Sequence, residues 1–260
     1  MKFVRELINE REKVFDENIN ENNNNDFIED EKTPRIMLDI LLHGHKIDGV
    51  LTRKDIEDHV LTMISAGTET SALAISSAIL FLGIHQEMQE KLYAEICENC
   101  PVDKEPFLVD YEMTRKMEYL EMIFKETVRL NPSVPNVGRV TGVPIPYDGL
   151  IIPARTEIYV SWFTFHRQKS IWGEDACEFS PERFLPENSI NRHQFAWSPF
   201  SLGVRNCIGY TYAKMSFKIS LIQFIRHFKV KTSLKWKDIE WQHDLHLHIT
   251  KPHLISVEKR

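Results

Sequence analysis

The sequence has no run of 18 consecutive apolar residues, and this absence predicts that the chain has no transmembrane helix. The first eight residues, MKFVRELI, carry too many charges for a secretory signal peptide. The chain also lacks the positive charge that nucleic acids attract, because its formal net charge is -6 at pH 7. We therefore expect a globular protein whose main partner is not a nucleic acid.

Cysteine is scarce. Four cysteines in 260 residues, without the spacing of a disulfide framework, indicate a reducing compartment. Cys97 and Cys100 form a C-x-x-C pair, but no second pair is present to complete a zinc site, so we expect two incidental cysteines at a helix end. With 42% hydrophobic and 27% charged residues, the chain can bury a core as one large domain or two.

Apolar residues recur at helical spacing over much of the chain. An Asn-rich, acidic stretch at residues 18–30 breaks the pattern and predicts a disordered surface loop. The expected helices span residues 1–16, 38–42, 52–82, 85–97 and 117–130.

The helix at residues 52–82 begins with a capping signal and has an unusual middle. Thr52 is the expected N-cap, with Asp55 at the capping-box position. Gly67 stands in the helix interior, where glycine costs about 1 kcal/mol relative to alanine. Either a group packs closely against the backbone there, or two helices cross and a Thr bonds to the preceding turn. The isolated segment favours the helix crossing.

Strand signals dominate residues 132–165 and the chain beyond Phe228. We expect residues 147–153 and 157–161 to pair as a hairpin. The turn between them contains Arg155, which is strained if the position requires a positive φ. The C-terminal histidines invite a metal interpretation, but no Cys or carboxylate spacing supports it, so we expect them to face solvent. They are His243, His246, His248 and His253.

The stretch at residues 200–209, FSLGVRNCIG, carries the strongest functional signal. Two apolar stripes follow it from Ile208 onward, which predicts a buried helix. Cys207 lies at the start of that helix, where free N–H groups and the helix dipole stabilise negative charge. A buried thiolate in this setting suits a soft metal or an iron centre. The simpler alternative is a structural cysteine at a helix start.

This stretch resembles the haem-binding loop of the cytochrome P450 superfamily at every spacing. The matching residues are Phe200, Gly203, Arg205, Cys207 and Gly209. The resemblance implies that Cys207 is the axial thiolate ligand of haem iron, a ligand that favours O–O cleavage. The glycines allow the loop to turn sharply beneath a flat macrocycle.

A second motif, residues 66–70, resembles the oxygen-activating segment of the same superfamily, small-Gly-x-acid-Thr. The resemblance places Gly67 beside bound oxygen, makes Thr70 the hydroxyl that stabilises it and makes Glu69 part of a proton relay. An acid next to an alcohol suits proton delivery. Ala66 fills a slot where some family-4 relatives carry a Glu that tethers haem, so we expect haem to be held without an ester link.

Two further motifs complete the resemblance. Glu126 and Arg129 match the family's E-x-x-R, and Arg183 belongs to a matching Pro-x-Arg-Phe. The resemblance implies that these three residues form a buried charged network, which is tolerable only as a hydrogen-bonded unit. It also makes Arg139 and Arg205 partners of the haem propionates, because guanidinium matches carboxylate bidentately. Residues 166–167 and 172–173 match another family stretch, for which we expect a packing role.

The four motifs occur in family order, which implies a mainly α fold with a small β region, the C-terminal part of the cytochrome P450 fold. Residues 1–50 are interpreted as a remnant of upstream helices plus the Asn-rich loop, and residues 51–260 as the haem-binding core. The subgroup it resembles is the eukaryotic microsomal, family-4-like one.

The implied activity is a haem-thiolate monooxygenase, an oxidoreductase acting on paired donors. Its cofactor would be haem b, and one oxygen atom from O₂ would enter a small apolar substrate. Electrons would come from NADPH through cytochrome P450 reductase, with cytochrome b5 as a further candidate donor. The implied location is the cytosolic face of the endoplasmic reticulum membrane. The alternative is a truncated, non-catalytic fragment without the anchor and the substrate pocket.

Overall fold

A computed structural model describes residues 2–22, 36–100, 107–252 and 254–260. Its contacts divide the chain into two compact units, one ending at Thr68 and the other beginning at Glu69. The division falls inside one long helix, whereas the sequence places the boundary at residue 50. We describe each unit separately.

The first unit is helical. It contains α1 (Lys2–Asn22), α2 (Met37–Lys46) and the first part of α3 (Arg53–Ile84). Helix α1 continues to Asn22, so the start of the predicted loop at residues 18–30 is helical and that expectation was wrong there; the remainder lies outside the described residues. The core of this unit consists of Val4, Ile8, Phe15, Leu38, Leu42, Ile56 and Val60.

The start of α3 has the predicted capping box. The Thr52 N–H donates to Asp55 Oδ2 at 2.8 Å, and the Asp55 N–H donates back to Thr52 Oγ1 at 3.2 Å. Thr52 Oγ1 also donates to Asp55 Oδ2 at 2.7 Å, and this bond, together with the one from the Thr52 N–H, lowers the pKa of Asp55. Two otherwise unpaired N–H groups at the helix start are thereby satisfied.

Helix α3 also corrects the expectation that no helix could span a membrane. It is long and apolar enough to do so by length and composition alone, because serines, threonines and a glycine interrupt its apolar runs without adding charge. The core helix of a soluble protein meets the same criteria. Ala78, Leu80 and Phe81 are fully buried in the second unit, so we describe this part of α3 as a core helix.

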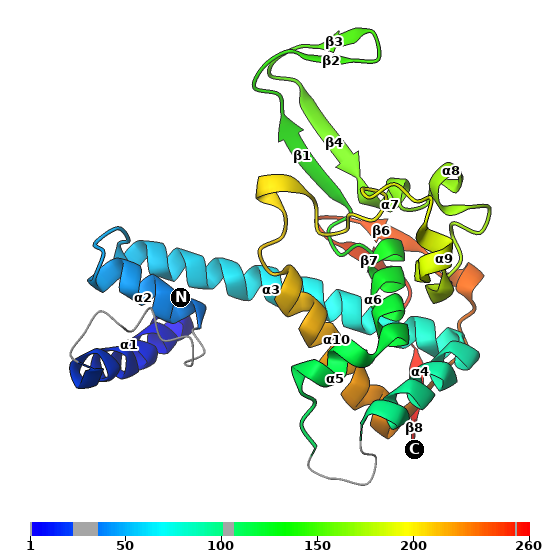
Figure 1. Cartoon of the computed structure of the whole chain (residues 1–260), viewed down its shortest axis with the longest axis horizontal. Helices are drawn as coiled ribbons and strands as arrows, with labels where there is room; N and C mark the ends of the chain where they lie inside the picture. The colour runs from blue at the N-terminus through cyan, green and yellow to red at the C-terminus, as the bar shows by residue number, and fades with distance from the viewer. Residues whose placement is uncertain (1, 23–35, 101–106, 253) are drawn as a thin grey trace. The chain divides into compact units, whose positions relative to one another are not determined.

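The second unit packs the end of α3 with α4 (Gln86–Asn99), α5 (Tyr111–Lys116), α6 (Glu118–Leu130) and α10 (Tyr210–His227) (Figure 1). The predicted helices at 85–97 and 117–130 are confirmed within two residues at each end. Its short helical elements are α7 (Trp162–Phe165), α8 (Lys169–Trp172), η2 (Pro181–Phe184), α9 (Pro186–Ser189), η3 (Gly203–Arg205) and η4 (Trp236–Asp238).

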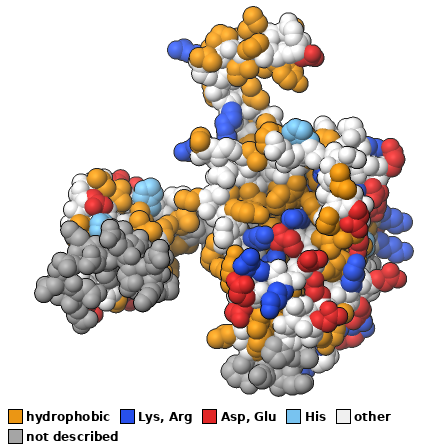
Figure 2. Space-filling model, in the orientation of Figure 1, with side chains coloured by type: hydrophobic (Ala, Val, Ile, Leu, Met, Phe, Trp, Pro, Cys, Tyr) orange, Lys and Arg blue, Asp and Glu red, His pale blue; other side chains and the backbone are white. Residues whose placement is uncertain are grey.

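The strands of the described residues form two-stranded antiparallel ladders. They pair β1 (Asn136–Val140) with β4 (Glu157–Ser161), β2 (Ile145–Tyr147) with β3 (Leu150–Ile152), β5 (Phe228–Thr232) with β8 (Ile255–Lys259), and β6 (Trp241–His243) with β7 (Leu247–Ile249). The β1–β4 ladder projects from the helices and carries the β2–β3 hairpin at its far end (Figure 1). Figure 2 shows hydrophobic side chains on this hairpin, where Tyr147, Leu150 and Ile151 are exposed.

The predicted hairpin between residues 147–153 and 157–161 was wrong. Strand β3 pairs with the preceding strand β2, and β4 pairs with the more distant β1. The reason is the turn at Asp148 and Gly149, where φ is +46° and +75°. Two consecutive positive φ values favour a tight two-residue hairpin, which joins β3 to β2.

The turn after β3 places Arg155 in the left-handed region, with φ +64°. The sequence predicted that Arg155 is strained if its position requires a positive φ, and φ is positive in the structure. The Arg155 N–H donates to the Thr141 carbonyl at 2.7 Å, so the conformation is fixed by the neighbouring strand end.

A buried glutamine joins α4 to β5. Gln89 Nε2 donates to the carbonyls of Leu82 at 2.9 Å and Val230 at 2.8 Å, and the Val230 N–H donates to Gln89 Oε1 at 2.8 Å. The Gln89 side chain is completely buried, so each of these bonds forms away from water.

Candidate haem-binding site

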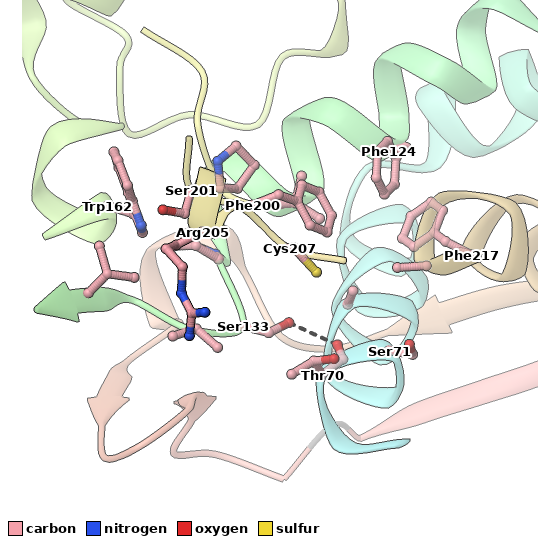
Figure 3. Close-up of a pocket in the computed structure, with 17 residues that line it drawn as sticks. Thr70, Ser71, Phe124, Ser133, Trp162, Phe200, Ser201, Arg205, Cys207 and Phe217 are labelled. Atoms are coloured by element: carbon pink, nitrogen blue, oxygen red, sulfur yellow. Dashed lines mark hydrogen bonds between the residues drawn. The ribbon is translucent and has the colours of Figure 1, made fainter. Parts of the chain in front are cut away.

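A cavity of ≈ 250 Å³ lies between the second unit's part of α3, α6, the segment before β1, the loop at residues 199–207 and α10 (Figure 3). Its walls are mostly apolar, with Ala74, Phe124 and Phe217 among them. The polar groups that reach it are few. They belong to Thr70, Ser71, Ser133, Ser201, Arg205 and Cys207.

The loop leading to Cys207 is held by its own backbone. Ser201 has φ +60° and Gly203 has φ +75°, so the chain turns twice through the left-handed region. The Cys207 N–H donates to the Phe200 carbonyl at 2.9 Å, and the Asn206 N–H donates to the Gly203 carbonyl at 3.1 Å. These bonds fix the position of the thiol relative to the phenyl ring of Phe200.

Gly209 leaves room beside the sulfur. A Cβ atom at this position would lie 3.8 Å from Cys207 Sγ, an ordinary van der Waals contact, so Gly209 lies directly beside the thiol. Helix α10 begins at Tyr210 with Gly209 as its N-cap. Cys207 therefore precedes the N-cap by two residues, within reach of the free N–H groups of the first turn.

The predicted burial of Cys207 and of the whole following helix was wrong. Cys207 is exposed, and Ile208 and Tyr212 are 88% and 63% exposed. Burial begins at Phe217, because only the later turns of α10 pack against the core helices. In the described part of the chain, the apolar side chains at the start of the helix are therefore exposed on the surface.

Phe200 connects the loop to the core through aromatic contacts. Its ring centroid lies 4.8 Å from that of Tyr210 and 6.0 Å from that of Phe124. Phe124 in turn meets Phe217 of α10 at 5.1 Å, edge to face. The loop is thus anchored on both α6 and α10 by rings that also form the cavity wall.

Two arginines lie on the loop side of the site. Arg205 lines the cavity. Arg139, on β1, reaches the loop, because its Nη2 donates to Ser201 Oγ at 3.5 Å, while its Nη1 donates to the Gly138 carbonyl at 2.8 Å. The structure therefore brings both predicted propionate partners to the same loop.

Only part of the segment that resembles the oxygen-activating motif, residues 66–70, lines the cavity. Thr70 lines the cavity, and its carbonyl accepts a hydrogen bond from Ser133 Oγ at 2.8 Å (Figure 3). Glu69 does not line it and pairs instead with His246, at 3.1 Å between Oε1 and Nδ1. Ala66 and Gly67 belong to the first unit.

Gly67 is not explained by a helix crossing. A Cβ atom there would meet no atom of the described residues within 4 Å. The neighbouring Thr68 does bond to the preceding turn, with Oγ1 donating to the Ile64 carbonyl at 2.7 Å. The expected hydrogen bond from a threonine to the preceding turn is therefore present, whereas the expected packing of a second helix against Gly67 is not found among the described residues.

The three predicted network residues meet in a fully buried cluster. Arg129 binds Glu126 bidentately, with Nε to Oε2 at 2.6 Å and Nη2 to Oε1 at 2.8 Å. Arg183 Nε lies 3.5 Å from Glu126 Oε1. The side chains of Glu126 and Arg129 are 0% exposed and that of Arg183 is 7% exposed. Ion pairing in so dry a site is favourable only where the other buried donors also find partners, and every guanidinium nitrogen of Arg129 and Arg183 except Arg183 Nε makes a hydrogen bond.

Backbone carbonyls supply those partners. Arg129 donates to the carbonyls of His166 at 2.5 Å, Ala176 at 2.7 Å and Glu178 at 3.1 Å. Arg183 donates to the Trp172 carbonyl at 2.6 Å and to both carboxylate oxygens of Asp175. The hydrogen bonds from Arg183 lower the pKa of Asp175. The network therefore fastens the segment from 166 to 183 onto α6.

His166 belongs to the same cluster and is completely buried. Its Nε2 accepts a hydrogen bond from the Ser198 N–H at 3.2 Å, which connects the network to the start of the cysteine loop. Burial, together with the positive charge of Arg129, lowers the pKa of His166 to about 3. The imidazole is thus neutral at ordinary pH, and it has the packing role expected for residues 166–167.

The residues around the cavity fit a haem group by the chemistry of their donors. The thiol of Cys207 stands on a mostly apolar wall, and a thiolate is a ligand that suits iron. Arg205 supplies a cation. Trp162 Nε1 is buried and has no acceptor among the described residues, although its ring lines the same cavity. A flat, apolar group that carries carboxylates would pack against the apolar wall and offer acceptors to Arg205 and Trp162.

The mainly helical fold, the small antiparallel ladders and the cysteine loop before a long helix agree with the fold expected from the cytochrome P450 resemblance. The chain belongs to the cytochrome P450 family, because the sequence model for "Cytochrome P450" matches residues 1–256.

Relatives with curated descriptions agree. The chain is 36% identical over 250 residues to "Probable cytochrome P450 4p3" of Drosophila melanogaster, covering 94% of this chain and 48% of that protein. It is 34% identical over 213 residues to "Probable cytochrome P450 313a4" of the same species, covering 82% of this chain and 43% of that protein. The expected likeness to family-4 members is confirmed. The chain spans about half the length of the curated relatives it matches.

Sequence reasoning missed several residues of the site. Ser133 and Trp162 reach the cavity from segments that carry no motif, and Asp175 is the unforeseen carboxylate partner of Arg183. The proximity of Glu69 to His246 and His248 was also missed. Only the Asn131-Pro132 break and the tryptophan itself offered a signal in the sequence, and neither identifies a site alone.

Proposed function

We propose that this chain forms the haem-binding core of a monooxygenase that inserts one oxygen atom from O₂ into a small apolar substrate. The observation that carries the proposal is the position of Cys207 on the wall of an apolar cavity that Thr70 also lines. The bound haem would supply a redox-active iron that activates O₂. Electrons would come from NADPH through a reductase, with cytochrome b5 as a further candidate.

The loop residues would hold the haem. Cys207 would be the iron ligand, and Gly209, whose Cβ position lies 3.8 Å from the sulfur, would let the backbone approach the haem beside it. Gly203 would let the loop turn away beneath the macrocycle. Arg205 and Arg139 would pair with the propionates, and Phe200 would hold the loop against α6 and α10.

Proton delivery would fall to α3. The Thr70 hydroxyl lies at the cavity, and its backbone is held by Ser133, so the side chain can present a hydrogen-bond donor at a fixed place. Glu69, the preceding residue of the helix, is 53% exposed and would exchange protons with solvent. Gly67 and Ala66 would complete this segment without an ester link to the haem.

The buried network would support the site from below. The network of Glu126, Arg129 and Arg183 holds the 166–183 segment against α6. His166 of this segment accepts a hydrogen bond from the N–H of Ser198, two residues before Phe200, and so connects the network to the cysteine loop. In the whole protein we place this core at the cytosolic face of the endoplasmic reticulum membrane.

A second candidate is a non-catalytic fragment. The chain spans only 43–48% of the relatives 313a4 and 4p3, and Val204 and Ile208 of the cysteine loop are 101% and 88% exposed. Exposed apolar groups on the loop would favour association over stable haem binding.

The test is the absorption spectrum of the ferrous carbon monoxide complex. With Cys207 as ligand we expect the red-shifted Soret band of thiolate ligation, lost in Cys207→Ala. A red-shifted band that persists in the variant would refute the ligand assignment. A chain that binds no haem on titration would favour the fragment.

Thr70→Ala then tests proton delivery in the haem-loaded protein. We expect normal haem content but diversion of NADPH electrons to peroxide. Ser71→Ala, which removes a neighbouring hydroxyl of the same cavity, is the matched control and should keep its coupling. Equal coupling in both variants would contradict the role of Thr70.

A further inference from the structure

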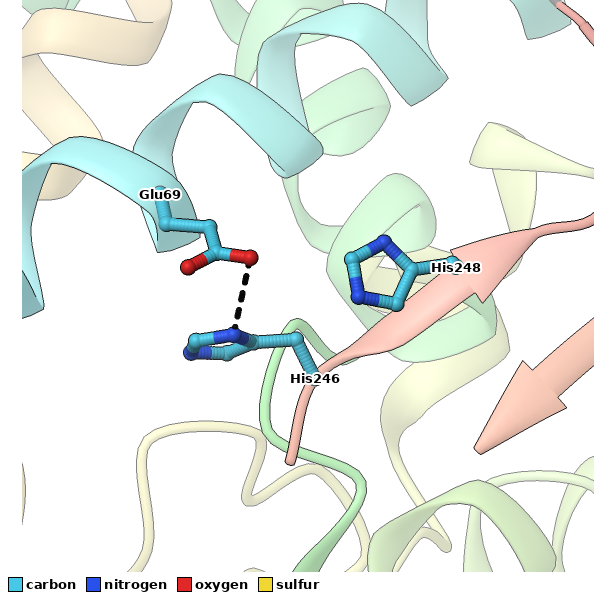
Figure 4. A group of neighbouring side chains, drawn as sticks. All are labelled: Glu69, His246 and His248. Carbon is cyan, nitrogen blue, oxygen red and sulfur yellow. Dashed lines mark ion pairs between the residues drawn. The ribbon is translucent and has the colours of Figure 1, made fainter. Parts of the chain in front are cut away.

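Three metal-ligating side chains meet on the surface of the second unit, away from the cysteine cavity. They are Glu69 of α3, His246 in the turn before β7, and His248 of β7 (Figure 4). One ligand atom from each lies within 4.8 Å of the other two. None of the three lines the cavity that contains Cys207. Both histidines are half-buried rather than solvent-facing, so that expectation was wrong for these two.

The hairpin holds both imidazoles on one side. His246 and His248 are separated by Leu247, which is completely buried and whose N–H donates to the Ser133 carbonyl at 2.9 Å. Alternation along a strand then turns both histidines to the opposite face. The Asp244 N–H donates to the His246 carbonyl at 3.1 Å and closes the turn. The two ring centroids lie 6.3 Å apart.

We propose that Glu69, His246 and His248 bind a divalent transition-metal ion, with Zn²⁺ the best match. Two imidazole nitrogens and one carboxylate oxygen are a common three-ligand zinc set, with water in the fourth position. Calcium and magnesium are poorer matches, because they prefer oxygen ligands.

The geometry is close to that of a bound ion. Ligand atoms about 2.0–2.1 Å from a tetrahedral zinc ion lie about 3.4 Å from one another. Glu69 Oε1 and His246 Nδ1 are already 3.1 Å apart. Contracting the remaining separations from within 4.8 Å requires a side-chain shift of about 1.4 Å at most. The Glu69 side chain is 53% exposed and can make that movement.

The simpler explanation is an ion pair between Glu69 and a protonated His246. It accounts for the 3.1 Å contact but assigns no role to His248. The metal site uses all three residues, so substitution of His248 separates the two explanations.

The experiment titrates metal-stripped protein at pH 7.5 with Zn²⁺ by calorimetry and with Co²⁺ by visible absorption. It uses the full chain in a Cys207→Ala background, so that the loop thiol does not compete. We expect one ion per chain and a Co²⁺ spectrum with no thiolate charge-transfer band. Glu69→Gln, His246→Ala and His248→Ala should each weaken binding more than the roughly 10–100-fold that loss of an outer-shell partner costs.

His243→Ala is the matched control, because His243 is an exposed histidine of the same hairpin outside the cluster. It should bind both ions as the parent does, and circular dichroism should show all variants folded. The proposal is overturned if the parent binds neither ion, if a thiolate band appears, or if His248→Ala binds as tightly as the parent. The readout does not involve haem, so its outcome is separate from that of the monooxygenase proposal, even though both proposals assign a role to Glu69.

Discussion

The buried arginine network and the cysteine loop differ in what holds them in place. Glu126 and Arg129 are completely buried, and their charges are matched by each other, by Arg183 and by backbone carbonyls. In the loop, Val204 and Ile208 are 101% and 88% exposed, and the backbone is held by hydrogen bonds within the loop and by the packing of the Phe200 ring.

This difference separates scaffold from ligand site. The network is complete within the described residues, so we expect it to determine whether the second unit folds. The loop adds little burial, so we expect substitutions there to alter what binds and leave the free energy of unfolding nearly unchanged. The two regions can therefore be tested independently by mutation.

The largest expected effect is in the network. Glu126→Ala leaves Arg129 as an unpaired buried charge, which typically costs about 3–5 kcal/mol of stability. The matched control is Glu112→Ala, since Glu112 and Arg115 form an exposed pair at the same i,i+3 spacing. Loss of an exposed pair costs at most about 1 kcal/mol. Urea unfolding followed by circular dichroism measures the free energy of unfolding of both variants. Equal losses of stability in Glu126→Ala and Glu112→Ala would show that the buried network is no more important for folding than an exposed ion pair.

The next effect is pH dependence through His166. Its pKa is lowered to about 3 in the folded chain by burial and by Arg129, against an unfolded value near 6.5. The unfolded chain therefore binds a proton first as pH falls. Stability contributed by neutral His166 is complete above about pH 6.5 and is lost between there and about pH 3, by about 1.4 kcal/mol per pH unit.

His166→Gln sharpens that result, because the amide can still accept from the Ser198 N–H but does not titrate. Urea midpoints of the two proteins, measured from pH 7 to pH 4, should diverge with the parent falling more steeply. Parallel curves would show that other groups control the acid sensitivity.

A smaller effect is expected outside both regions, at the exposed turn containing Arg155. A non-glycine residue with φ +64° is strained by about 1 kcal/mol, and glycine removes that strain. Part of the gain is offset by the greater freedom of glycine in the unfolded chain. We expect Arg155→Gly to raise the free energy of unfolding by about 0.5 kcal/mol, measured by urea denaturation. Its neighbour Ala154 is a control, because Ala154→Gly should lower it.

The smallest stability effect is expected at the cysteine itself. Cys207→Ala removes an exposed thiol, so the free energy of unfolding of the haem-free chain should change by less than about 0.5 kcal/mol. The same urea titration measures it. A loss of several kcal/mol would show that the loop is part of the scaffold and that the two regions are not separable.

The sequence predicted the local features well. The Thr52 capping box and the helices near 86–99 and 118–130 follow from residues close together in the chain, as does the location of the turn in which Arg155 is strained. Such features depend on hydrogen bonds and steric limits within one turn, so neighbouring residues are sufficient to specify them.

The errors concern partners that are distant in sequence. The hairpin was assigned to the wrong strands because Pro146 obscured β2, although the Asp148-Gly149 turn that joins β2 to β3 is local. The pairing of β4 with the more distant β1 has no such local signature. The exposure of Ile208 could not be foreseen either, since an apolar stripe does not reveal whether the chain supplies a surface to cover it. Glu69 and His246 lie far apart in the sequence, so no spacing rule connects them.

Gln89 has a consequence for the edge of the β5–β8 ladder. Val230 lies opposite Val257, yet its N–H and carbonyl both bind the amide of Gln89 on the other side. Toward Val230 the primary amide presents one donor and one acceptor, the same pair that an adjacent strand would present, and its Nε2 also donates to the Leu82 carbonyl. The side chain thus imitates a third strand for one residue, and it denies that stretch of β5 to a strand from another molecule.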